Sequence, residues 1–219
     1  MPKTQPIDLA YPLDPTTPVF PNYPPVVLEV LESTRYRRTD GRRALNSSRI
    51  TVGIHTGTHM DAPFHFFEDG VTIDQVPLDV CVGHAVMINL RNALAHGMID
   101  VQHLKPQEAK IRELGRIVVD TGWSEHWGKP DYFYAHPMFT PEAAQYLVES
   151  GVRMVAVDMP SVDRAPFPVH IAFLGKGVII VENLTNLSSI KSEVFQFAAL
   201  PLKFTGRDGS PVRATAWED

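Results

Sequence analysis

Three of the nine histidines in this chain lie within eleven residues, together with an aspartate. They are His55, His59 and His65, and Asp61 lies between the second and the third. Neutral imidazole nitrogens and carboxylate oxygens are the ligands that zinc, manganese and similar divalent ions accept. A single histidine is usually a polar loop residue, but four such side chains at this density favour a metal site.

The residues between these side chains predict an extended chain rather than a helix. Gly57 and the β-branched Thr56 and Thr58 separate the first two histidines, and Pro63 follows closely. The glutamate that helical zinc proteases carry directly after their first histidine is absent. Side chains alternate along an extended chain, so all four would start on one face. Gly57 would then leave room for an ion or a substrate against the backbone.

Two unusual segments precede this motif. Six prolines between residues 12 and 25 predict an extended N-terminal arm that follows the surface, because each proline fixes φ and removes a donor. Residues 33–48 are polar and arginine-rich, and they separate the apolar runs at residues 26–31 and 50–54. We interpret residues 33–48 as a loop or lid, with a surface excursion without function as the alternative.

The rest of the chain mixes strand-like runs with two helical patterns. Runs of β-branched or aromatic residues predict strands at residues 84–90, 117–120, 132–135, 154–158, 178–181, 195–204 and 212–217. A cap at Thr140, Pro141 in the first turn and Gly151 after the end predict a helix over residues 142–150, and a second helix covers residues 106–114. Strands that follow both helices predict mixed α/β architecture.

Composition narrows the class of protein. A length of 219 residues with 44% hydrophobic and 21% charged content fits one globular domain. A net charge of -5 supplies no basic stripe for a phosphate backbone, so we expect no nucleic-acid partner. The only cysteine, Cys81, is expected to be buried, and it fits a reducing compartment. Without an apolar run of roughly 18 residues or a signal-peptide pattern, we expect a cytoplasmic protein that does not enter membranes.

Two other kinds of site compete with a catalytic metal. Nucleophilic catalysis has little support, because the chain has no Gly-x-Ser-x-Gly elbow and Cys81 has only His84 nearby in sequence. A structural metal site is normally closed by four ligands and rich in cysteine. The histidine and carboxylate set here, with a spare histidine, predicts an open position for water. The other lone histidines are expected to be surface or packing residues: His84, His96, His103, His126 and His136.

The histidine motif and several co-linear segments resemble the cyclase-like metal hydrolases, a family that includes bacterial kynurenine formamidase and isatin hydrolase. The further segments cover nearly the whole chain: Ile7-Asp8-Leu9, Thr17-Pro18-Val19-Phe20-Pro21, Val76-Pro77-Leu78-Asp79, Asp158-Met-Pro-Ser161, Leu200-Pro-Leu-Lys-Phe204 and Ser210-Pro-Val-Arg213. The resemblance implies an α/β fold, with residues 1–219 forming a single mixed-sheet domain of the swivelling β/β/α type.

The resemblance also implies a set of site residues. The metal ligands would be His55, His59, Asp61, His170 and Glu182. Asp61 can bridge two ions, and His65 would be the proton donor and acceptor. His170 and Glu182 have the separation of twelve positions that the family shows, although the residues alone would not have paired them. Phe20 would contact the substrate, at a position where formamidases of this type tend to carry tryptophan.

The implied activity is hydrolysis of a C–N bond other than a peptide bond. The expected substrate is a small aryl formamide like N-formylkynurenine, and the alternative is a cyclic amide or a lactone, as in isatin hydrolase. Zinc is the expected ion, with manganese as the alternative and one or two ions per chain. The family suggests a homo-oligomer, a dimer or a tetramer. Aromatic residues available for a pocket wall are Phe20, Phe64, Phe66, Phe67, Trp123 and Trp127.

Overall fold

A nine-stranded mixed sheet forms the body of the protein. The structure is a computed structural model that describes residues 5–35, 42, 44–94 and 96–218. The strands lie in the order β1 (Ile7–Asp8), β13 (Thr215–Trp217), β11 (Val194–Ala198), β5 (Val82–Asn89), β7 (Arg116–Asp120), β9 (Met154–Val157), β10 (Ile179–Glu182), β4 (His59–Asp61) and β12 (Gly209–Pro211). The central strands β5, β7, β9 and β10 are parallel, and the strands on both flanks are antiparallel.

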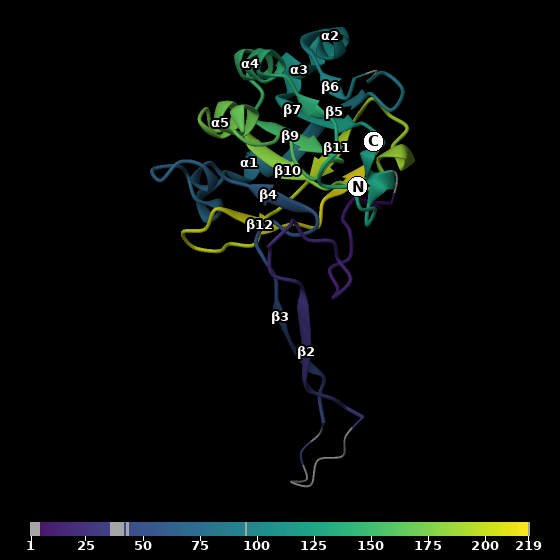
Figure 1. Ribbon diagram of the computed structural model, residues 1–219, viewed down its shortest axis with the longest axis vertical. Helices are drawn as coiled ribbons and strands as arrows, with labels where there is room; N and C mark the ends of the chain where they lie inside the picture. Colours follow the sequence, from purple (N-terminus) through teal and green to yellow (C-terminus); the bar gives the residue numbers. More distant parts are fainter. Residues whose placement is uncertain (1–4, 36–41, 43, 95, 219) are drawn as a thin grey trace.

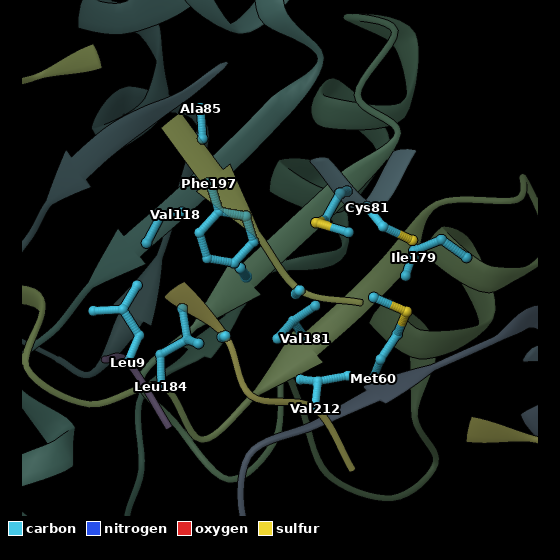
Figure 2. Packing of buried hydrophobic residues seen from close by; sticks show 14 of the residues in the cluster. Leu9, Met60, Cys81, Ala85, Val118, Ile179, Val181, Leu184, Phe197 and Val212 are labelled. Atoms are coloured by element: carbon cyan, nitrogen blue, oxygen red, sulfur yellow. The ribbon is translucent and has the colours of Figure 1, made fainter. Parts of the chain in front are cut away.

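Strands β7, β9 and β10 are buried on both faces, which explains their nearly continuous apolar sequences. Along β10, Val181 faces one hydrophobic core and its neighbour Ile180 faces the other, and β7 alternates in the same way. The first core also receives Leu9, next to one edge strand, and Met60 from β4 near the other edge (Figure 2). Side chains from both ends of the sheet therefore meet, because the sheet curls around this core.

Helices cover the second core (Figure 1). They are α2 (Val101–Leu104), α3 (Glu108–Leu114), α4 (Pro141–Glu149) and α5 (Pro168–Leu174). The short helix α1 (Leu78–Cys81) packs on the first core. Short 3-10 helices occupy Pro63–His65 (η1), Ile73–Gln75 (η2), Lys105–Gln107 (η3), Trp123–His126 (η4) and Leu187–Ser189 (η5), and β6 (Met98–Ile99) pairs with β8 (Met138–Phe139). None of the described helices is long and apolar enough to cross a membrane.

A two-stranded hairpin projects from the body (Figure 1). It consists of β2 (Val27–Glu32) and β3 (Ser47–Thr51), which pair with each other and join no other described strand. Of the predicted loop at residues 33–48, the described residues 33–35 and 44–46 flank the outer ends of β2 and β3, and the last two residues belong to β3. Residues 36–41 and 43 of that loop lie outside the described part of the chain.

Most predicted elements of the body are confirmed. The predicted strands at residues 84–90, 117–120, 154–158 and 178–181 correspond to β5, β7, β9 and β10. Helix α4 begins as expected, because the Thr140 hydroxyl accepts a hydrogen bond from the Ala143 N–H at 3.1 Å. Gly151 follows its end with a φ of 80°, a left-handed conformation that glycine adopts readily.

Three strand predictions need correction. Residues 132–135 form turns, because Tyr132 is buried and its hydroxyl donates to the Asn183 side chain at 2.7 Å. The strand predicted over residues 195–204 ends at Ala198, and Pro201 makes only an isolated bridge to Val212, because a proline lacks the N–H of a regular ladder. The strand predicted over residues 212–217 begins only at residue 215.

Candidate metal centre and aromatic cavity

Strand β4 presents two of the predicted ligands to the end of a parallel strand. His59 and Asp61 are two residues apart on β4 and share one face. In the antiparallel register His59 lies opposite Glu182, the last residue of β10. The His59 Nε2 atom lies 3.3 Å from the Glu182 Oε2 atom. Residues 123 positions apart in the sequence thus become neighbours through this pairing.

The prediction of one extended face from His55 to His65 is wrong. Only residues 59–61 of this motif are strand, residues 54–58 form turns and bends, and His65 ends η1. Gly57 has a φ of 64°, and a Cβ atom there would lie 2.6 Å from the Leu13 side chain. The space beside Gly57 is therefore filled by Leu13. The turn still folds His55 back, so its Nδ1 atom lies 2.6 Å from the Asp61 Oδ1 atom.

Helix α5 brings His170 to the opposite side of Asp61. The His170 Nε2 atom lies 3.6 Å from Asp61 Oδ2 and 3.5 Å from Glu182 Oε1. The Asp163 carboxylate accepts hydrogen bonds from the N–H groups of Val169 at 2.6 Å and His170 at 3.2 Å, and it contacts His170 Nδ1 at 2.6 Å. Asp163 therefore fixes both the first turn of α5 and the ring of His170.

The other two histidine rings, of His55 and His59, also contact an oxygen atom with their second ring nitrogen. The Nε2 atom of His55 contacts Asp208 Oδ2 at 2.6 Å, and the Nδ1 atom of His59 contacts the Gly57 carbonyl oxygen at 2.8 Å. A carbonyl oxygen only accepts, so His59 donates from Nδ1 and turns Nε2 toward the carboxylates. Metal-binding histidines usually have such an acceptor behind them, because it fixes the tautomer and the ring orientation.

The charges of the cluster favour a cation. Burial raises the pKa of Asp61, but the neighbouring histidines outweigh burial and hold it well below its usual value. Burial and the charge of Asp61 raise the pKa of Glu182, but hydrogen bonds from His170 and His59 together with the charge of His170 outweigh both and lower it. Both carboxylates are therefore ionised although they are almost fully buried. Two buried negative charges require positive charge beside them.

The histidines respond to the same electrostatic field. Burial lowers the pKa of His55, but Asp61 and Asp208 outweigh burial and raise it to about 10. The pKa of His170 also rises well above its ordinary value, because contacts with Asp163, Asp61 and Glu182 outweigh burial. Protonated histidines thus supply the positive charge in the metal-free chain. A divalent ion would supply it when the rings are neutral, so the donor set fits such an ion.

The donor atoms of the expected ligands converge in two groups that share one carboxylate, and a third candidate group combines His55 with His65 and Asp208. His55, His59 and Asp61 offer atoms within 4.8 Å of one another, and Asp61, His170 and Glu182 do the same. The structure therefore brings together all five of the expected ligands, although they come from distant segments. The shared position of Asp61 fits one ion in either group or two ions on its two oxygens.

His65 lies beside the five expected ligands and belongs to the third candidate group. Its ring stacks on the His55 ring with 3.9 Å between centroids, and it lines a cavity. The His65 Nδ1 atom lies 3.8 Å from Asp208 Oδ2. Burial is the largest influence on His65 and lowers its pKa, so the ring is mainly neutral near pH 7. A neutral ring that faces the cavity can accept a proton from a reacting group.

The cavity above the cluster has a volume of about 260 Å³. The ligand side chains and Gly57 form its floor. Its walls are mostly aromatic: Phe20, Tyr23, Phe66, Trp127, Phe133 and Phe167. Of the predicted wall candidates, Phe20, Phe66 and Trp127 line the cavity, whereas Phe67 and Trp123 pack against the second core and Phe64 is not part of the lining. Phe20 contacts the Phe133 ring edge to face, with 5.5 Å between centroids.

Three polar residues that support the site were not predicted from the sequence. Asn183 has a φ of 60°, and its amide donates to the Gly57 carbonyl oxygen at 2.9 Å. Its position directly after Glu182 in the sequence could have indicated that Asn183 lies at the site. Asp163 lies two residues after the segment that ends at Ser161, which also marks it. Asp208 carries no such signal, because it is 153 positions from His55.

The lone histidines do not belong to the candidate metal groups. His136 is buried and contacts the Pro137 carbonyl oxygen, and His103 completes a capping box with Asp100. These two contacts confirm the expected packing roles. Cys81 is fully buried as predicted, and burial raises the pKa of its thiol to about 11. A thiol with this pKa is protonated at neutral pH, so Cys81 is a poor nucleophile.

Comparison with known proteins identifies the family. Residues 7–164 match the model of the Cyclase family, described as "Putative cyclase". The kynurenine formamidase of Geobacillus thermodenitrificans (strain NG80-2) is 33% identical over 212 residues and covers 95% of each chain. That of Bacillus mycoides (strain KBAB4) is 32% identical over 217 residues, 98% of each chain. Isatin hydrolase A from Labrenzia aggregata, bound to benzyl benzoate, matches with a TM-score of 0.84, 26% identity and coverage of 98% of this chain and 93% of that chain. This chain belongs to the Cyclase family, with the fold of its hydrolases.

Proposed function

We propose that this chain is a metal-dependent hydrolase that cleaves the C–N amide bond of a small aryl formamide of the N-formylkynurenine type. The observation that carries the proposal is the buried cluster of histidines and carboxylates at the floor of an aromatic cavity. The similarity to kynurenine formamidases over nearly the whole chain supports the same chemistry. We further propose that residues 1–219 act as one hydrolase domain.

The proposed metal ligands are the five residues of the cluster: His55, His59, Asp61, His170 and Glu182. Zinc suits these nitrogen and oxygen donors, and manganese is the alternative. The two groups around Asp61 would hold one or two ions. When bound, such an ion polarises a carbonyl group and lowers the pKa of water to about 7.

The chain's own residues then position the substrate and move protons. The Phe20 ring would contact the aryl group, with the other aromatic walls excluding water around it. His65 would take a proton from the attacking water at Nδ1 or Nε2 and deliver it to the departing amine nitrogen. The Asp208 carboxylate, 3.8 Å from His65 Nδ1, would stabilise the imidazolium form between these two transfers.

A cyclic amide or a lactone is the second candidate substrate. The described residues that line the cavity include neither lysine nor arginine. The amino-acid end of N-formylkynurenine carries a carboxylate that a cationic partner would stabilise, whereas a neutral ring amide needs no such partner. This observation favours the isatin type, as does the similarity to isatin hydrolase A.

Two properties of the protein outside the cavity complete the proposal. We propose a homo-oligomer, because apolar side chains remain exposed on the projecting hairpin. The single buried cysteine supports a reducing compartment such as the cytoplasm.

Turnover of defined substrates tests the proposed function. Metal-loaded protein would be incubated with N-formylkynurenine, isatin and a small panel of lactones, beside a matched metal-free preparation. Hydrolysis of one substrate class by the loaded protein alone supports the proposal and selects the class. A protein that binds metal through four protein ligands without a solvent oxygen, and that hydrolyses none of these substrates, would be a structural metal protein instead.

A further inference from the structure

Tyr132 is a fully buried residue whose ring supports the aromatic wall of the cavity. The ring contacts two wall residues edge to face, Trp127 with 5.2 Å and Phe133 with 5.1 Å between centroids. Tyr132 itself is not among the residues that line the cavity. It therefore supports the wall through these two rings and does not contact a substrate in the cavity.

The hydroxyl group of Tyr132 makes a different contact, with the Asn183 side chain. The Asn183 Nδ2 atom donates to the Gly57 carbonyl oxygen at 2.9 Å, which leaves the Oδ1 atom to accept from the Tyr132 hydroxyl at 2.7 Å. Burial raises the pKa of Tyr132 well above its ordinary value. The hydroxyl therefore keeps its proton and donates it to this hydrogen bond.

The Gly57 carbonyl oxygen connects this contact to the floor of the cavity. The same oxygen accepts from the Nδ1 atom of His59 at 2.8 Å. With Nδ1 held there, the His59 Nε2 atom lies 3.3 Å from Glu182 Oε2. Three consecutive hydrogen bonds thus link the Tyr132 hydroxyl to the ring of an expected metal ligand.

Asn183 is well placed to transmit this contact because each of its polar groups is used. Its N–H donates to the Met159 carbonyl oxygen at 2.9 Å, and its carbonyl oxygen accepts from the Thr58 hydroxyl at 2.6 Å. Asn183 directly follows Glu182, and Thr58 directly precedes His59. Asn183 therefore joins the end of β10 to the turn before β4, and its amide is held in place by Tyr132.

Packing alone does not explain a tyrosine at position 132. A phenylalanine would make the same ring contacts with Trp127 and Phe133. A buried hydroxyl group costs free energy unless it has a hydrogen-bond partner. The hydroxyl is therefore useful at this position through its contact with Asn183, which lies beside the proposed metal ligands.

We propose that Tyr132 is a positioning residue for the metal centre: its hydroxyl group, through the Asn183 amide and the Gly57 carbonyl oxygen, fixes the His59 ring in the orientation that binds an ion. The inference rests on the proposed metal binding by His59. A wild-type chain that binds no zinc would contradict the proposed metal centre and with it this inference. Zinc binding that is insensitive to the Tyr132 hydroxyl would contradict this inference alone.

The first test measures zinc affinity by competition with a chromogenic chelator. Tyr132→Phe should raise the dissociation constant for zinc about tenfold, because the acceptor behind a ligand ring is less well fixed. Tyr11→Phe is the matched control. The Tyr11 hydroxyl donates to the Ser124 carbonyl oxygen at 2.9 Å and its ring stacks on Trp127, so this variant also loses one hydroxyl hydrogen bond beside the wall. The control should keep wild-type affinity, and equal affinity in Tyr132→Phe would overturn the proposal.

The second test asks whether Tyr132 acts through Asn183. Asn183→Gly removes the amide but tolerates the φ of 60° at this position, and it should weaken zinc binding about tenfold or more. Addition of Tyr132→Phe to this variant should cause no further loss, because both substitutions interrupt the same hydrogen bonds. Losses that multiply in the double variant would overturn the proposed route through Asn183.

The third test separates metal positioning from fold stability. Metal-free Tyr132→Phe and Tyr11→Phe should lose similar amounts of unfolding temperature, because each lacks one hydroxyl hydrogen bond. With cobalt at saturation, Tyr132→Phe should change the visible absorption bands of the bound ion, which report the ligand geometry, whereas Tyr11→Phe should retain the wild-type bands. A lowered unfolding temperature in Tyr132→Phe with a wild-type cobalt spectrum and wild-type zinc affinity would assign the hydroxyl to folding and overturn the proposal.

Discussion

The floor and the wall of the cavity are held in different ways. Each histidine of the floor has a second contact behind it, such as the Asp163 carboxylate behind His170 and the Gly57 carbonyl oxygen behind His59. The wall depends on ring contacts, and Phe20 keeps 45% of its surface exposed. The floor is therefore rigid and specifies the chemistry, whereas the wall can change without disturbing the floor.

Elementary energetics explain this difference. Buried carboxylates such as Asp61 are tolerated only with charged or hydrogen-bonding partners in good geometry, so few substitutions are compatible with the floor. An aromatic ring at the wall contributes mainly through the area that it covers, and another ring can replace it. The comparison predicts that floor variants lose the reaction and that wall variants change its substrate.

The largest effect is expected at the shared ligand. Asp61→Asn should lower kcat/KM about 10³-fold or more, because both ligand groups lose an anionic oxygen and a bound ion supplies several kcal/mol of transition-state stabilisation. Bound metal per chain should fall in parallel. Asp158→Asn is the matched control, since Asp158 is also buried at a strand end but contacts Thr121 instead. Full metal content and full turnover in the Asp61→Asn variant would contradict the proposed role of the cavity floor.

Substitution of the proposed proton carrier, His65, should affect the chemical step without affecting metal binding. His65→Ala should lower kcat about 10²- to 10⁴-fold, because a positioned acid and base contributes this much. Its metal content should stay at the wild-type level, since His65 lies outside the two ligand groups that share Asp61. A His65→Ala protein with normal metal and full turnover would remove His65 from its proposed role.

The carboxylates behind the histidines should have intermediate effects. Asp208→Asn and Asp163→Asn should each weaken metal affinity about 10- to 100-fold, because the acceptor that orients a ligand ring is weakened. Competition with a chromogenic chelator would measure both affinities. If two ions bind, each variant should affect mainly the ion nearest its own histidine, His55 or His170. Unchanged affinity in both variants would show that these contacts do not position the ligands.

The wall should give the smallest effect. Phe20→Ala should raise KM for an aryl substrate about fivefold, which is about 1 kcal/mol, because a partly exposed ring loses part of its burial. kcat and metal content should stay unchanged, and Phe20→Trp should restore KM. Tyr134→Ala is the control, since Tyr134 is an exposed aromatic residue that does not line the cavity. A large loss of kcat in the Phe20→Ala variant would show that Phe20 contributes to the reaction itself and not only to substrate binding.

The sequence predicted local elements better than long-range contacts. Local patterns were sufficient to predict β7, β9 and β10 from their apolar runs and α4 from its capping residues. These elements depend on burial and on residues that are close in the sequence. The prediction of an extended face from His55 to His65 was wrong, since the chain turns at Gly57, which has a left-handed φ of 64° and lies against Leu13. The Asp208 contact with His55 depends on how β12 pairs with β4, which no local pattern reveals.

The central claim is that the clustered histidines and carboxylates hold the ion on which hydrolysis depends. The most direct measurement removes metal by dialysis against a chelator and follows turnover as zinc or manganese is returned, with bound metal measured on the same samples. The account predicts no turnover without metal and full turnover at one or two ions per chain. A metal-free preparation that hydrolyses its substrate at the full rate would contradict it.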